Sequence, residues 1–196
     1  TPMITRSIPS SSEALPVIGL GGAATFGRLA RSGDLSPLRA VLTALLDNGG
    51  TVFDTAAAYE ASEVIAGRLA QELGIEAQLF WSTKVNSAIP EWGPSYPDVT
   101  RQQIQDSFDR IGKSSIDLMQ IHNLGDIKTQ LPMIQELKEE GRVRYIGITY
   151  DTPDRHDELI QAMRDETLDF IGIDYAVDNT AAAETILPLA QDQGIA

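Results

Sequence analysis

Residues 51–85 read TVFDTAAAYEASEVIAGRLAQELGIEAQLFWSTKV, and this stretch decides the class of fold. Residues 51–53 are apolar and short, which predicts a strand. From residue 62 the apolar side chains recur at helical spacing as far as Gly74, a residue typical of helix C-termini. Residues 78–85 then predict a second strand. Two strands joined by a helix lie parallel in one sheet, because a parallel pair needs a crossover connection.

The same strand–helix unit recurs along the chain. Further strands are predicted at residues 15–20, 116–121, 143–148 and 168–175, and further helices at 36–48, 98–112, 129–140, 154–165 and 180–193. Six units in a row indicate a parallel sheet covered by helices. No low-complexity linker interrupts them, so we expect residues 1–196 to form a single domain.

Composition narrows the classes of function. The net charge of −13 argues against nucleic acid or an anionic membrane surface as a partner. No run approaches the roughly 20 apolar residues that a membrane helix needs. Residues 1–13 lack the pattern of a secretory signal, so we expect a cytoplasmic protein. The chain has no cysteine, and its His, Asp and Glu residues lack metal-ligand spacing, so no metal site is predicted.

Two folds satisfy the repeat: a doubly wound sheet and a (β/α)8 barrel of the TIM type. Residues 19–26 (GLGGAATF) lack the third glycine of the dinucleotide fingerprint, which disfavours the doubly wound fold. Asp54, Lys84, His122 and Thr149 stand at or just past the C-terminal ends of the second to fifth predicted strands. Barrels carry their chemistry at that rim. We therefore predict an α/β fold of the (β/α)8 TIM-barrel type, with six βα units present.

Four side chains near this rim suggest acid–base chemistry. Lys84 interrupts the apolar run FWSTKV, and a buried lysine needs a partner or a lowered pKa. Asp54, one strand away, is the natural partner. Tyr59 follows five residues later, and a nearby ammonium would lower the tyrosine's pKa and make it a proton donor or acceptor near neutral pH. His122 could orient a carbonyl group or share the proton.

Each of these residues alone also has a purely structural explanation. Asp54 would fit a cap for the turn that follows it, and Lys84 would fit a side chain that extends from the rim into solvent. Tyr59 would fit an ordinary packing residue, and His122 a histidine held by structural hydrogen bonds. The catalytic interpretation is favoured because all four stand near the ends of successive strands.

From about residue 14 onward the chain resembles the aldo-keto reductase family. The matching pieces are FDTAAAYEASE (53–63), FWSTKV (80–85), DLMQIHN (117–123) and GRVRYIGIT (141–149). The resemblance implies reduction of a small-molecule aldehyde or ketone by hydride from NADPH. It also implies that Tyr59 is the general acid, that Lys84 and Asp54 tune it, and that His122 positions the substrate carbonyl.

The chain departs from the family at three positions that contact the nicotinamide. Thr149 and Tyr150 stand where Ser-Asn is usual, Gly172 stands where a glutamine is usual, and Gly22 is followed by alanine where the family often has threonine. By the resemblance, Gly22, Thr149 and Tyr150 are the cofactor-binding candidates. The altered contacts make NADPH binding the part of the prediction that most needs a test.

Two further expectations concern the loops and the edges of the sheet. Residues 86–99 contain three prolines and predict a loop over the site, with Trp92 as an apolar wall for the substrate. The family's barrel has eight βα units and this sequence shows six. We expect the outer edges of the first and sixth strands to lie unpaired, and a homodimer would be the simplest way to cover them.

Two alternatives to the reductase remain from the sequence. The first is a cofactor-independent proton-transfer enzyme, an isomerase, lyase or cyclase that uses Tyr59, Lys84 and His122. The second is a non-catalytic barrel remnant that binds a ligand or partner.

Overall fold

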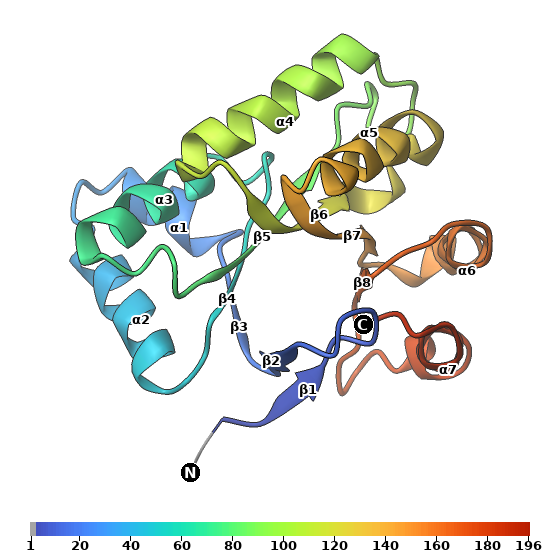
Figure 1. Ribbon diagram of the computed structural model, residues 1–196, viewed down its shortest axis with the longest axis horizontal. Helices are drawn as coiled ribbons and strands as arrows, with labels where there is room; N and C mark the ends of the chain where they lie inside the picture. The colour runs from blue at the N-terminus through green and yellow to red at the C-terminus, as the bar shows by residue number, and fades with distance from the viewer. Residues whose placement is uncertain (1–2) are drawn as a thin grey trace.

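The computed structural model describes residues 3–196, which fold around a six-stranded parallel sheet (Figure 1). Its strands stand side by side in chain order: β3 (Gly19–Gly21), β4 (Val52–Asp54), β5 (Phe80–Val85), β6 (Ile116–Ile121), β7 (Val143–Tyr150) and β8 (Phe170–Ile173). All pairs are parallel, so the C-terminal ends lie along one rim. The predicted fold class is confirmed: six βα units form an incomplete barrel.

Helices cover the outer face of the curved sheet (Figure 1). They are α1 (Thr25–Ala30), α2 (Ser36–Asp47), α3 (Ser62–Leu73), α4 (Pro97–Ile111), α5 (Ile127–Glu139), α6 (His156–Asp165) and α7 (Ile186–Gln193). The short α1 was not predicted. Helices α3 and α4 approach closely at Gly67, where an added Cβ would lie 2.4 Å from the carbonyl oxygen of Ile111.

Alternating side chains divide the core into an outer and an inner part. Outward-facing residues such as the fully buried Trp81 pack against the helices. Inside the barrel, Phe80 packs in a smaller apolar cluster that includes Ile8. Farther along β5, Ser82 and Lys84 face the interior and bond to polar partners. The interior therefore changes from apolar to polar toward the C-terminal rim.

An antiparallel hairpin, β1 (Thr5–Ser7) with β2 (Ala14–Pro16), packs at the apolar end of the interior. The sequence predicted one strand over residues 15–20. The structure divides that stretch between β2 and β3, because its first half pairs within the hairpin and its second half pairs with β4.

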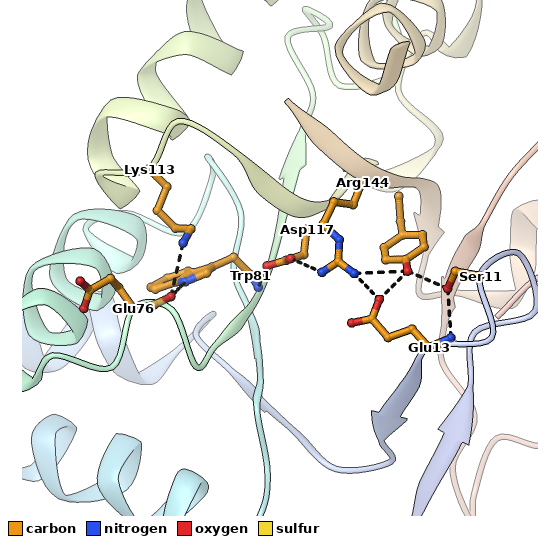
Figure 2. A network of polar contacts seen from close by, with 8 residues as sticks. Ser11, Glu13, Glu76, Trp81, Lys113, Asp117 and Arg144 are labelled. Carbon is orange, nitrogen blue, oxygen red and sulfur yellow. Dashed lines mark hydrogen bonds and ion pairs between the residues drawn. The ribbon is translucent and has the colours of Figure 1, made fainter. Parts of the chain in front are cut away.

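Polar contacts tie the hairpin to β7 (Figure 2). Glu13 accepts hydrogen bonds from the side chains of Arg144 and Tyr145, and the Tyr145 hydroxyl oxygen lies 2.7 Å from Ser11 Oγ. Arg144 also pairs with Asp117 at 2.7 Å. The contacts of Ser11 and Glu13 join residues more than 130 positions apart and hold the hairpin in place.

The C-terminal part differs from prediction in two respects. The helix predicted at residues 180–193 is a 3-10 turn, Ala181–Ala183, followed by α7, because the chain leaves helical geometry at Thr185. On the side of β8 away from β7, the Ile171 amide donates to the Ala196 carbonyl at 2.9 Å, and the Ala196 amide donates to Asp169 at 2.8 Å. The expectation of an unpaired outer edge is therefore wrong for this part of β8.

Across residues 3–196, every helix is too short or too polar to cross a lipid bilayer.

Candidate active site

The C-terminal rim of the sheet holds a hollow of about 500 Å3. Side chains from the ends of several strands line it: Asp54, Tyr59, Lys84, His122, Thr149 and Asp174. The structure therefore brings together the four residues predicted for acid–base chemistry. They meet because parallel strands present their C-terminal ends at the same edge.

Lys84 and Asp54 form an ion pair at the base of the hollow. The lysine Nζ donates to Asp54 Oδ2 at 2.5 Å and to the Thr55 carbonyl oxygen at 2.8 Å. Ser82 donates to the other carboxylate oxygen at 2.6 Å. Burial lowers the pKa of Lys84, whose residue is 6% exposed, and the Asp54 carboxylate opposes that shift. Asp54 is thus the ion-pair partner of Lys84, as predicted. This contact accounts for the aspartate at the end of β4 without a role as a cap for the turn.

Tyr59 lies on the loop between β4 and α3, beside this pair. The lysine Nζ is 5.0 Å from the centre of the tyrosine ring. Burial, reinforced by the charges of Asp54 and Asp151, raises the pKa of Tyr59 above its usual value. The expected net lowering of the Tyr59 pKa is therefore wrong, since burial and two carboxylates determine the direction of the shift. A phenol with a raised pKa keeps its proton at neutral pH, which suits a proton donor.

His122 faces Tyr59 from the end of β6. Its Nε2 lies 3.5 Å from the Tyr59 hydroxyl, and the two rings meet edge to face with centroids 5.5 Å apart. Burial lowers the pKa of His122, and the Lys84 charge lowers it further, against the carboxylates of Asp54, Glu91 and Asp151. The imidazole is therefore neutral near pH 7 and can donate or accept one hydrogen bond at the hollow.

The two cofactor candidates at the end of β7 point their side chains to opposite faces of the sheet. Thr149 lines the hollow, and its hydroxyl accepts the backbone N–H of Asn123 at 3.2 Å. Tyr150 also lines the hollow, but its side chain packs in the outer apolar core and its hydroxyl donates to Asp154 at 3.1 Å. At Gly172 an added Cβ would come within 2.9 Å of the Thr149 side chain, so glycine suits this close packing. The Tyr150 hydroxyl is thus engaged away from the barrel interior.

Gly22 and Trp92 have contacts that explain them structurally. The Gly22 amide donates to the Asp54 carbonyl at 2.8 Å, and an added Cβ would lie 2.4 Å from Ser62 Oγ. Trp92, 54% exposed, stands at the rim with its indole N–H bonded to the Asn123 carbonyl at 2.8 Å. The Arg155 guanidinium lies over its ring at 4.9 Å. These bonds do not test whether Gly22 contacts the cofactor or Trp92 contacts the substrate. Both contacts stay predictions.

Sequence reasoning missed three polar residues near the hollow. Asp151 and Asp174 follow β7 and β8 and line it. Gln120 lies inside the barrel, where its side-chain nitrogen donates to Ser82 Oγ at 3.2 Å. The signal for the two aspartates was present, because each is a polar residue directly after a strand. Asp151 matters most, since its charge contributes to the raised pKa of Tyr59.

The family model described as the Aldo/keto reductase family matches residues 17–196. The chain belongs to this family. Among curated relatives, the NADH-specific methylglyoxal reductase of Escherichia coli K12 is 29% identical over 215 residues, covering 97% of this chain and 65% of that protein. An aldo-keto reductase of Bacillus subtilis is 29% identical over 189 residues, covering 91% and 55%. The chain thus spans about two thirds or less of the length of these aldo/keto reductases.

Solved aldo-keto reductases share the fold. The holo form of one from Bacillus halodurans superposes with a TM-score of 0.81 at 23% identity, covering 99% of this chain and 64% of that one. One from Klebsiella pneumoniae in complex with NADPH gives a TM-score of 0.77 at 22% identity, covering 98% and 66%. The incomplete barrel therefore corresponds to about two thirds of these family structures.

Proposed function

We propose that this aldo/keto reductase chain carries the acid–base site for reduction of an aldehyde or ketone by NADPH. The observation that carries the proposal is the Tyr59 phenol, 3.5 Å from His122 and beside the Lys84–Asp54 pair. Membership of the family supports it, as do the names of the relatives. One relative is NADH-specific and one neighbour holds NADPH, so NADH is the competing cofactor to test.

The residues divide the proton chemistry between them. Tyr59 keeps its proton at neutral pH and donates it to the substrate's carbonyl oxygen as negative charge develops there. The Lys84 ammonium then stabilises the phenolate that remains, and Asp54 keeps the lysine charged. The neutral His122 imidazole orients the carbonyl oxygen by a hydrogen bond. When bound, NADPH would supply the hydride to the carbonyl carbon, and with the proton from Tyr59 this would give the alcohol.

We propose that the hollow receives the nicotinamide end of the cofactor. It measures about 500 Å3, and Lys84, Thr149 and Gly172 are among the residues that line it. We propose that Thr149 contacts the nicotinamide, with Gly22 near it. Tyr150 would act through its backbone or ring, because its hydroxyl is bonded to Asp154.

Replacing Tyr59 with phenylalanine tests the assignment. Loss of a general acid should lower kcat by about 100-fold or more, while NADPH affinity, measured by fluorescence titration, stays the same. Tyr96→Phe is the matched control, because Tyr96 is 62% exposed on the loop before α4. Full activity in Tyr59→Phe, with the control also active, would show that another group supplies the proton.

A proton-transfer reaction without a cofactor is the second candidate. One contrast favours it. All four acid–base residues are present at the hollow, whereas the Tyr150 hydroxyl is bonded to Asp154 and Gly172 has no side chain to bind a nicotinamide. Titration with NADPH and NADH separates the two, since binding supports the reductase. Turnover of a carbonyl compound without either dinucleotide supports proton transfer. Absence of both binding and turnover would support the non-catalytic remnant. A homodimer that covers the outer edge of β3 stays a prediction.

A further inference from the structure

The turn that follows His122 has an unusual backbone. Asn123 and Leu124 have φ angles of 55° and 56°, and Asp126 has a φ of 28°. Residues other than glycine seldom adopt positive φ, and such conformations persist only where surrounding contacts hold them. The direction of the His122 side chain depends on this turn, so the groups that hold the turn also aim the imidazole.

Asn86, directly after β5, reaches into the turn with its side-chain amide. Its Nδ2 donates to the His122 carbonyl oxygen at 3.0 Å and to the Glu91 carbonyl oxygen at 3.3 Å. Its Oδ1 accepts the Ala88 amide at 3.0 Å. The amide lies so close to Gly125 that an added Cβ there would be 2.3 Å from it. Asn86 therefore links the end of β5 directly to the backbone of His122.

Gln130, on the first turns of α5, completes the link. Its residue is fully buried, and its Nε2 donates to the Gly125 carbonyl oxygen at 2.7 Å and to Asn86 Oδ1 at 3.4 Å. Its Oε1 accepts the Ser87 amide at 3.0 Å. The side-chain amides of Asn86 and Gln130 are thus each bonded to backbone groups of both the loop after β5 and the turn after β6. A buried amide satisfied in this way fixes the two loops relative to each other.

We propose that Asn86 and Gln130 are positioning residues for His122, which hold the turn so that the imidazole faces the Tyr59 hydroxyl. The catalytic consequence rests on the proposed function. Neither amide touches the Tyr59 hydroxyl in the described contacts; both act through the backbone of residues 122–125. Without the Asn86 donor, the His122 carbonyl keeps only the Gly125 amide, at 3.1 Å, as a hydrogen-bond donor, and the link from the end of β5 to the backbone of His122 is lost.

The first experiment observes the imidazole itself. The chain contains two histidines, so the Hε1 ring protons of His122 and His156 give two signals in a proton NMR titration. Burial and the charges of Lys84, Asp54, Glu91 and Asp151 determine the direction of the His122 pKa shift, and the Tyr59 hydroxyl faces the ring at Nε2. In Asn86→Ala, the His122 signal should shift and its midpoint should rise toward that of a solvated imidazole, while the His156 signal stays in place. Asn48→Ala, which removes an amide at the end of α2, should leave both signals unchanged.

The second experiment measures turnover. In Asn86→Ala, kcat should fall by about tenfold with KM changed by less than about twofold, because misplacement of a positioned group by a fraction of an ångström acts on the chemical step. The pH profile of kcat should move with the His122 midpoint. Gln130→Met, which keeps the length of the side chain and removes the donor to Gly125, provides a second variant should Asn86→Ala fail to fold.

Each outcome decides something. If His122 in a folded Asn86→Ala or Gln130→Met titrates as in wild type, the positioning role is overturned. If the signal moves and kcat does not, the catalytic consequence is overturned. If the wild-type chain shows no turnover with either dinucleotide, the proposed function fails while the NMR comparison still tests the positioning.

Discussion

Replacing Lys84 with methionine removes the ammonium that lies 5.0 Å from the centre of the Tyr59 ring. At that separation, a unit charge stabilises a phenolate by about 1 to 3 kcal/mol, for effective dielectric constants between that of water and about 20. The lysine favours the ionised phenol, so its loss should raise the pKa of Tyr59 further above its already raised value. The increase should be about 0.7 to 2.1 units, since one unit corresponds to about 1.4 kcal/mol.

The same interaction should appear in the rate. A phenolate develops as Tyr59 gives up its proton, so the full stabilisation is lost in the transition state. The reduction step should then slow by about 5-fold to about 150-fold. Asp54 keeps its 2.6 Å bond from Ser82 and is partly exposed, so removal of the lysine should not unfold the chain.

Two assays check this prediction. Tyrosinate absorbance is followed against pH in Lys84→Met, with the corresponding titration of Tyr59→Phe/Lys84→Met subtracted to isolate Tyr59. NADPH oxidation with an aldehyde is measured in parallel. Lys128→Met, on the exposed face of α5, is the control and should match wild type in both. Ionisation of Tyr59 at the same or a lower pH in Lys84→Met would refute the reasoning.

Two further predictions concern stability. Burial and Lys84 lower the pKa of His122 in the folded chain. A histidine in the unfolded chain titrates near 6.5, so the unfolded chain binds the proton at a higher pH than the folded chain does. The free energy of unfolding of the wild type should therefore decrease as the pH falls below about 6.5. His122→Asn should lack this loss in urea unfolding at about pH 7.5 and about pH 5.5; an equal loss in both proteins contradicts the assignment. Gly67→Ala should destabilise the chain by about 1–3 kcal/mol, because the new Cβ would lie 2.4 Å from the Ile111 carbonyl oxygen. Gly21→Ala, which meets nothing within 4 Å, should change the urea midpoint little, and similar midpoints for both variants would refute this estimate.

The side-chain direction of Tyr150 could have been predicted from the sequence. Successive residues of a strand point to opposite faces, so the side chains of Thr149 and Tyr150 were bound to point away from each other, even though both residues line the hollow. The structure has Thr149 at the hollow and the Tyr150 hydroxyl on Asp154. The family comparison had grouped the two positions, and strand alternation would have separated them.

Other features depended on contacts that no local pattern contains. Ile8 packs inside the barrel with Phe80, far along the chain, and Tyr145 joins that cluster from β7. Gln130 reaches from α5 to backbone groups on two loops. Such contacts are made between segments that come together only when the whole sheet has formed, so neither the hairpin's position nor the role of the two amides could be predicted.

By itself, the sequence determined that Asp54, Lys84 and His122 share one rim, because the repeat of strand and helix forces the strands to be parallel and their ends to coincide. Tyr59 was predicted to lie near these residues because it follows Asp54 by only five positions in the sequence. Only the tertiary structure decided the direction of the Tyr59 pKa shift. That sign depends on burial and on Asp151, which approaches from the end of another strand, and a balance of desolvation and charge is set by distances in space.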